Sequence, residues 1–188
     1  MNSNANLRAS PGEKLVFLAE TVMADTVMAE DALLCLIDGR LFAQPITTQR
    51  ADSLKLDIEL AEGVDAFVAR SGRLQDTVGD KLLPAVLAWL AEPVGPAIDN
   101  LGRAERLGWL ASGTAWIECR QLRNFMIHEY VRDMTVLAAA LCKGHQAVPL
   151  LVATAPALAE VVCGNDNDGS ESAISRSWKS MAGFGSNC

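Results

Sequence analysis

The chain has 188 residues, half of them hydrophobic and 21% charged, so it can bury one sizeable core, and disorder throughout is excluded. Its 16 basic and 23 acidic side chains give a net charge of −7. That balance argues against a protein that coats nucleic acid non-specifically, although it is compatible with a local basic site.

The cysteines and the apolar segments indicate the compartment. The chain has five cysteines and no CxxC pair, which favours neither a disulfide framework nor a Cys-based zinc site. Two histidines are too few for a His-rich metal site. The N-terminus does not resemble a signal peptide, and the longest apolar stretch, AVPLLVATAPALAEVV, contains two prolines and a glutamate. We expect a cytoplasmic protein with reduced thiols, no cofactor, no metal and no membrane association.

The first half of the chain reads as two long helices and a shorter one. A helix is predicted over 13–37, after the start signal Ser10-Pro11-Gly12 and before Asp38-Gly39. A second is predicted over 48–79, with Thr47 or Thr48 as its N-cap. A third is predicted over 80–91, with a kink or a break at Pro84.

The second half continues the helical pattern. Residues 92–102 are predicted to form a loop, 104–110 a short helix or turn, and 114–141 one continuous helix. His145 is expected in the loop that follows. No sustained period-two pattern occurs, so we predict an all-α bundle of about four to six helices. The expected division is a helical domain over 10–145, an additional helix within 146–163 and a flexible tail over 164–188.

The most informative stretch is WIECRQLRNFMIHEYVRD, residues 116–133, which combines apolar positions with many polar groups. On a helix, Asn124 and His128 share a face, whereas Arg123 and Tyr130 nearly eclipse one another on a second stripe. The long arginine can lean across the gap between the stripes. The pattern therefore predicts one polar patch with a guanidinium, an amide, an imidazole and a phenol.

This set of groups suits a phosphodiester. A guanidinium binds phosphate oxygens and stabilises developing charge, and an imidazole transfers protons near neutral pH. RNA supplies its own nucleophile, the 2′-hydroxyl. Cleavage normally needs both a base and an acid, however, and His128 is the one histidine in the patch. Two copies of the helix packed about a two-fold axis would supply both, which predicts a homodimer.

The residues RNFMIHEY (123–130) resemble the Arg–x4–His motif of the HEPN family. They also match the extended Arg–x4–His–x–Tyr form of HepT-like toxins, which are partnered by minimal nucleotidyltransferase antitoxins. The stretches 67–84 and 98–110 are similar to other helices of such proteins, so the resemblance covers roughly residues 10–145.

The resemblance implies a metal-independent endoribonuclease whose site lies between two helical protomers. Arg123 and His128 would be catalytic, and Asn124 would support them. Tyr130, the chain's one tyrosine, would accept AMP groups from the nucleotidyltransferase, which would silence the nuclease.

Other interpretations of the same residues remain open. Arg123 and His128 could form a structural polar pair in a helical interface, and Tyr130 could pack against a neighbouring helix. The whole protein could be a non-catalytic helical module that binds a nucleotide or a nucleotidyltransferase. Arg73, Asp76 and Asp80 are spaced for ordinary pairing along their own helix, or could support the motif. The tryptophans at 89, 109 and 116 read as core residues more than as base-stacking platforms.

Overall fold

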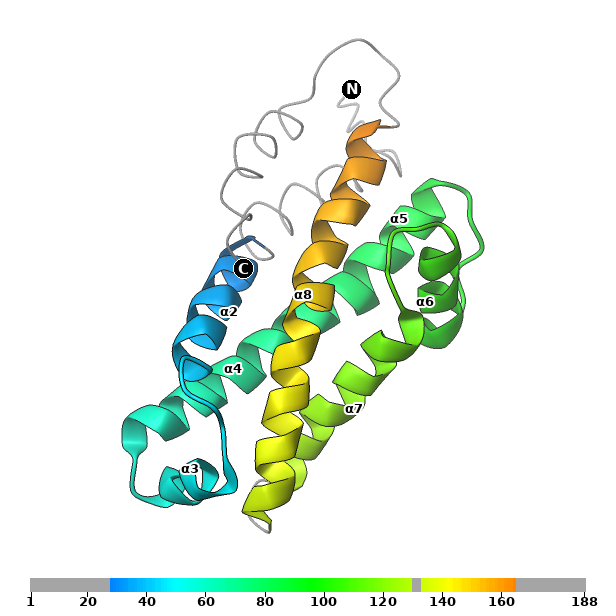
Figure 1. Ribbon diagram of the computed structural model, residues 1–188. Helices are drawn as coiled ribbons and strands as arrows, with labels where there is room; N and C mark the ends of the chain where they lie inside the picture. The colour runs from blue at the N-terminus through cyan, green and yellow to red at the C-terminus, as the bar shows by residue number, and fades with distance from the viewer. Residues whose placement is uncertain (1–27, 130–132, 165–188) are drawn as a thin grey trace, which may run out of the picture.

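The computed structural model describes residues 28–129 and 133–164, and all regular secondary structure within these ranges is helical, which confirms the predicted all-α fold. Helix α8 runs through the middle of the bundle, and α7 and the continuous α4–α5 rod lie beside it (Figure 1). In chain order the elements are α2 (Met28–Leu41), α3 (Thr48–Asp52), the 3-10 helix η2 (Ser53–Lys55), α4 (Ile58–Asp76), the π-helix η3 (Thr77–Leu82), α5 (Leu83–Trp89), α6 (Ala97–Arg106), α7 (Gly113–Glu129) and α8 (Met134–Gly164).

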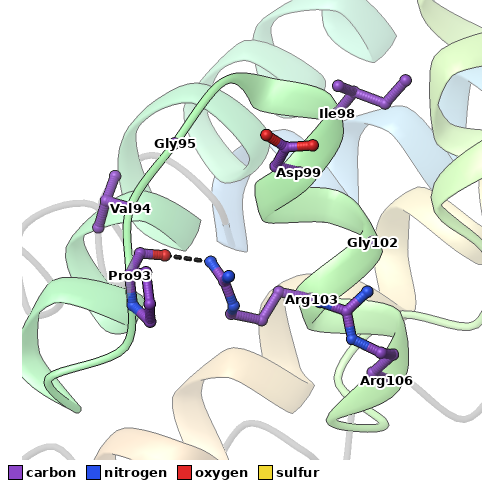
Figure 2. Close-up of a pocket in the computed structure, with 8 residues that line it drawn as sticks. All are labelled: Pro93, Val94, Gly95, Ile98, Asp99, Gly102, Arg103 and Arg106. Carbon is purple, nitrogen blue, oxygen red and sulfur yellow. Dashed lines mark hydrogen bonds between the residues drawn. The ribbon is translucent and has the colours of Figure 1, made fainter.

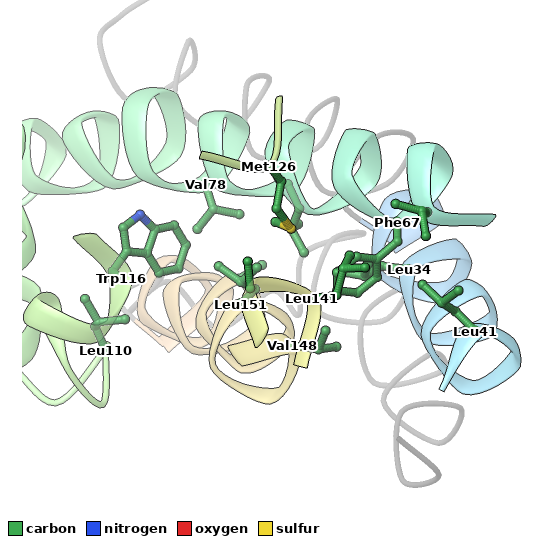
Figure 3. Close-up of a cluster of buried hydrophobic side chains, with 14 of the residues drawn as sticks. Leu34, Leu41, Phe67, Val78, Leu110, Trp116, Met126, Leu141, Val148 and Leu151 are labelled. Carbon is green, nitrogen blue, oxygen red and sulfur yellow. The ribbon is translucent and has the colours of Figure 1, made fainter. Parts of the chain in front are cut away.

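The core lies where α2, α4, α7 and α8 meet (Figure 3). Phe67 of α4 is fully buried, and its ring meets the Phe42 ring edge-on at a centroid separation of 5.4 Å. Gly144 of α8 lets this ring approach closely, because a Cβ there would lie 3.2 Å from it. Trp116 of α7 is also buried, as its apolar context predicted. This packing fixes α7, the helix that carries the motif, against α4 and α8.

Side-chain N-caps fix where α3 and α4 begin. Thr47 is the N-cap of α3, as predicted, and its hydroxyl accepts a hydrogen bond from the backbone N–H of Arg50. The helix predicted over 48–79 is interrupted, however, since Asp57 caps a new helix by accepting from the N–H of Leu60 at 3.0 Å. The apolar periodicity of 48–79 continues across Asp57, so it does not reveal this second N-cap.

The predicted kink at Pro84 takes the form of a π-helix, so α4 continues through η3 into α5 without a break. Proline has no N–H, and its ring clashes with the carbonyl four residues earlier in a regular α-helix. The wider π turn accommodates it: the N–H of Leu83 donates to the carbonyl of Val78, five residues back.

The loop predicted over 92–102 is shorter than expected, because α6 already begins at Ala97. Buried Asn100 fixes the preceding turn, with its side chain donating to the carbonyl of Gly95 and accepting from the N–H of Gly95, both at 2.9 Å. This clamp joins residues five apart and leaves no periodic signature in the sequence.

The single helix predicted over 114–141 is instead two helices. Helix α7 ends at Glu129, and Asp133 begins α8 by accepting hydrogen bonds from the backbone N–H groups of Thr135 and Val136. Helices α7 and α8 then pack against each other along the bundle. The segment 146–163, predicted as an additional helix, is the second half of α8, and the predicted tail beyond Gly164 lies outside the described residues.

Helix α8 passes through Pro149 and Pro156. By length and composition its Met134–Val161 stretch could cross a membrane, a property that it shares with core helices of helical bundles. In this fold it packs against α2, α3, α4, α5 and α7. Its buried positions, among them Leu141, Leu151 and Leu158, belong to the common core.

His145 lies within α8, and not in a loop as predicted. Its Nδ1 contacts the Asp38 carboxylate at 2.8 Å, and its ring stacks on Phe42 with a centroid separation of 4.2 Å. Burial raises the pKa of Asp38, and the hydrogen bond from His145 opposes that rise. This contact holds the last turn of α2, which continues past the predicted stop at Asp38-Gly39 to buried Leu41.

The cysteines differ from expectation at one position. Cys35 of α2 is disulfide-bonded, so the expectation of reduced thiols is wrong for this residue. Cys119 and Cys142 are free thiols.

An acidic pair at the start of α2, buried Glu30 and half-buried Asp31, makes the stability of the fold depend on pH. Glu30 binds Arg70 and Arg73 of α4 at 2.7 and 3.1 Å. Asp31 has no such partner: its Oδ1 is buried without a hydrogen bond, and burial together with the charge of Glu30 raises its pKa from 3.8 to about 7. The folded state therefore favours protonated Asp31, and the stability that this contributes is lost as pH rises from about 4 through 7.

Asp31→Asn should flatten this pH dependence because asparagine cannot ionise. The difference in unfolding free energy between the variant and wild type should therefore shift in favour of the variant as the pH is raised from 4 to 8, by at most about 4 kcal/mol. Urea unfolding at the two pH values measures the difference. Asp52→Asn, at an exposed position of α3, is the matched control. Equal pH slopes for wild type and Asp31→Asn would contradict the assignment.

Candidate functional site

The predicted motif lies on one uninterrupted helix. Helix α7 includes Arg123, Asn124 and His128, so their helical spacing is confirmed at the level of the backbone. The Asn124 side chain is exposed and makes no hydrogen bond within the described ranges. Tyr130 lies outside the described residues.

Arg123 is held against α4 by two contacts. Its Nη1 donates to Oδ1 of Asp76, the last residue of α4, at 2.8 Å. Its guanidinium also lies over Gly72, where a Cβ would come within 2.5 Å of Nε and 3.0 Å of Cζ. The side chain is 27% exposed, so it is largely enclosed but still reaches solvent. Gly72 is needed here because any side chain would occupy the space of the guanidinium.

Arg120, one turn earlier on α7, extends this pairing. It forms an ion pair with Asp80 of the π-helix and approaches Oδ1 of Asp76 at 3.6 Å. The Asp80 carboxylate is the main cause of a raised pKa for Arg120. We call Asp76, Asp80, Arg120 and Arg123 the α4–α7 charge cluster. Its two guanidinium and two carboxylate groups carry no net charge when all are ionised.

The packing of α4 and η3 on α7 sets the register of this cluster. Buried Gln75 donates a hydrogen bond from Nε2 to the carbonyl of Trp116 at 2.9 Å. Gly79 of the π-helix allows the Trp116 indole to lie against the backbone, because a Cβ there would be 2.9 Å from Nε1. Both contacts involve Trp116, one turn before Arg120 and two turns before Arg123, so they place Asp80 beside Arg120 and Asp76 beside Arg123.

The pairing within one helix that the spacing of Arg73, Asp76 and Asp80 favoured is wrong. Arg73 binds Glu30 of α2, and the two aspartates bind the arginines of α7. Asp76 and Asp80 therefore lie beside the motif helix, and a supporting role for them stays a prediction. The sequence does not reveal the pairing of the two aspartates with the arginines of α7, because the paired residues are 40 or more positions apart.

The arginine-rich stretch that includes the motif is more neutralised than its sequence suggests. Arg103 of α6 pairs with Glu92 at 3.5 Å and donates to the carbonyl of Pro93. Among the described arginines between 103 and 123, Arg106 is the one without an ion pair. Local positive charge available for an anion is therefore limited in a single chain.

An open pocket of about 360 Å³ lies away from the motif, between the α5–α6 loop and α6 (Figure 2). Arg103 and Arg106 line it together with the apolar side chains of Val94 and Ile98. None of its lining residues comes from α7. It is thus separate from the α4–α7 charge cluster.

Within the described residues, α7 offers one thiol as a candidate nucleophile, Cys119. Burial raises the pKa of Cys119 on α7, so its thiol stays protonated near neutral pH and is a poor nucleophile. Within the described ranges, no group of three His, Cys, Asp or Glu side chains is arranged to hold a metal ion. The group of α7 best placed to bind an anion is the largely enclosed Arg123 guanidinium, which still reaches solvent.

Comparisons of the chain with protein-family models, with curated proteins and with solved structures give no match.

Proposed function

We propose that this protein is a metal-independent endoribonuclease of the HEPN type, resembling HepT-like toxins, with Arg123 and His128 as its catalytic residues. The observation that supports it most is the Arg–x4–His spacing on the uninterrupted helix α7, with the Arg123 guanidinium held in place at the α4–α7 packing surface. The all-helical fold is compatible with this family.

The proposed reaction uses the RNA's own 2′-hydroxyl. One imidazole removes the 2′-hydroxyl proton as the oxygen attacks phosphorus, and a second imidazole protonates the departing 5′-oxygen as its bond to phosphorus breaks. Arg123 stabilises the charge that develops on the phosphoryl oxygens. The product is a 2′,3′-cyclic phosphate and a free 5′-hydroxyl. Asn124, exposed beside Arg123, would support the two catalytic residues.

A two-fold homodimer supplies the second imidazole in this proposal. Each chain contributes one Arg123 and one His128 to a shared cleft. The dimer would bring the guanidinium groups of two chains into one cleft, and because Arg120 and Arg123 are each paired with a carboxylate of their own chain, it would add hydrogen-bond donors there and not net positive charge. This confined site distinguishes the proposed function from non-specific RNA binding.

The test combines an activity and an association measurement. The purified protein should cleave single-stranded RNA or tRNA in EDTA, and light scattering should report a dimer. A protein that is monomeric at high micromolar concentration, or that leaves all tested RNA intact, would overturn the proposal.

Tyr130 is the proposed site of regulation. A cytoplasmic minimal nucleotidyltransferase would attach AMP from ATP to the phenolic oxygen of Tyr130, with release of pyrophosphate, and silence the nuclease. Incubation with such an enzyme and ATP should add the mass of one or more AMP groups to a peptide that contains Tyr130. Tyr130→Phe should show no added mass and should stay active. AMP transfer to another residue in the wild-type protein would contradict this assignment.

The α4–α7 charge cluster favours a second candidate function, a non-catalytic module that binds a nucleotide or a nucleotidyltransferase. Its arginines are already paired with carboxylates, which lowers the attraction for a long polyanion. This candidate predicts no RNA cleavage but measurable binding of the nucleotide or the enzyme. Arg123→Ala should abolish that binding, as measured by calorimetry.

A further inference from the structure

The contacts of Arg123 distinguish it from a freely mobile surface arginine. A carboxylate binds one end of its guanidinium, and the backbone of Gly72 lies against the group from Cδ to Cζ. The Asp76 bond uses Nη1 alone, and the other N–H donors of the guanidinium make no hydrogen bond within the described part of the chain. The pairing therefore fixes the group and leaves donors for a ligand.

We propose that Asp76 is a positioning residue: it holds the Arg123 guanidinium against Gly72, with its remaining N–H donors free for the scissile phosphodiester of RNA. This inference rests on the proposed ribonuclease function and adds to it the residues of α4. Held in one geometry, Arg123 meets the phosphate without first having to be ordered, and pre-organisation of this kind raises the rate of the chemical step.

The local fold explains why Asp76 can do this. It is the last residue of α4, immediately before the π-helix, and its side chain is 38% exposed. Gln75 beside it is buried and bonded to the carbonyl of Trp116, so the backbone at Asp76 is tied to α7. A carboxylate on a fixed backbone constrains the arginine more than one on a loop would.

If Asp76 instead competed with the substrate phosphate for Arg123, its removal would have the opposite effect on RNA cleavage. If Asp76 occupied the place of the substrate phosphate, its removal would free Arg123 and raise cleavage. If Asp76 positions Arg123, its removal lowers cleavage, and the two outcomes differ in sign. The competition model is therefore an outcome that overturns the proposal.

The first experiment replaces Asp76. Asp76→Ala should lower kcat for RNA cleavage about 10- to 100-fold with a smaller change in KM, since a misplaced catalytic group can cost on the order of 100-fold. Asp76→Asn keeps an acceptor oxygen and should fall between Asp76→Ala and wild type. Asp65→Asn, at an exposed position of the same helix, is the matched control and should cleave like wild type. Activities are compared per folded protein, which separates positioning from lost stability.

The second experiment moves Arg123 without touching Asp76. Gly72→Ala puts a Cβ into the guanidinium, and because this is the far end of a flexible side chain, the arginine moves while the helix stays folded. Cleavage should fall as it does in Asp76→Ala. Gly63→Ala on the same helix is the control, since its Cβ would make an ordinary contact of 3.7 Å with Leu41. Wild-type activity in Gly72→Ala would contradict the proposal.

A structural readout separates the failure of this inference from the failure of the proposed function. The Arg123 Nε–H signal, assigned by its loss in Arg123→Lys, should report a rigid side chain in wild type and Asp65→Asn. It should report a mobile one in Asp76→Ala. If the wild type leaves RNA intact while this difference holds, the ribonuclease is wrong and the positioning contact stands. If Arg123 is equally rigid without Asp76, or cleavage is unchanged or increased, the positioning role is wrong.

Discussion

His128→Ala should lower RNA cleavage about 100- to 10,000-fold, the range that general acid–base groups contribute. In the proposed dimer each cleft uses His128 from both chains, so one substitution removes the base and the acid together. The variant should keep its fold, because α7 is held by Trp116, Gln75 and the ion pairs of its arginines. Single-turnover cleavage of a labelled oligoribonucleotide in EDTA, with circular dichroism to confirm folding, measures the effect.

The chain offers a matched control, because it contains one other histidine. His145 pairs with Asp38 and stacks on Phe42, contacts that join α8 to α2. His145→Ala should therefore lower stability and leave cleavage per folded molecule unchanged. Undiminished cleavage by His128→Ala would exclude His128 as a catalytic residue.

Phe67→Ala should lower the free energy of unfolding by about 3–5 kcal/mol, the usual cost of removing a fully buried phenylalanine. The ring packs against Phe42 and fits over Gly144. Its loss would leave a cavity where α2, α4 and α8 meet. Urea unfolding monitored by circular dichroism measures the change.

Leu56→Ala is the control for this prediction. Leu56 is 90% exposed just before α4, so its truncation should change the free energy of unfolding by less than about 0.5 kcal/mol. Equal effects of the two substitutions would contradict the described core. A large effect of Leu56→Ala alone would place Leu56 in an interface.

The features that the sequence predicted correctly depend on local patterns. Helical periodicity identified an all-α protein, Thr47 read as an N-cap, and the spacing of Arg123 and His128 placed both on one helix. The apolar surroundings of Trp116 indicated a core residue, as observed. In each case neighbouring residues carry enough information, because helix geometry and capping are set within a few positions.

The features that were missed depend on contacts between distant segments. Asp76 and Arg123 are 47 residues apart, and nothing local distinguishes their pairing from pairing along one helix. The extension of α2 past Gly39 results from packing of its last turn, which outweighs local propensity, whereas the π-helix before Pro84 is a local response to the proline whose form the sequence does not specify. The helix boundary at Asp133 was missed because the apolar residues Val131, Met134 and Leu137 continue the helical spacing across it.

The proposed ribonuclease activity depends most directly on the attacking nucleophile, the 2′-hydroxyl of the RNA. A short single-stranded RNA that the protein cleaves is compared, in EDTA, with the same strand carrying a 2′-deoxy nucleotide on the 5′ side of the cleaved bond, and the products are analysed by mass spectrometry. Attack by the 2′-hydroxyl should give a 2′,3′-cyclic phosphate from the RNA and no cleavage at the substituted position. Cleavage at the 2′-deoxy position, or a product without the cyclic phosphate, would contradict it.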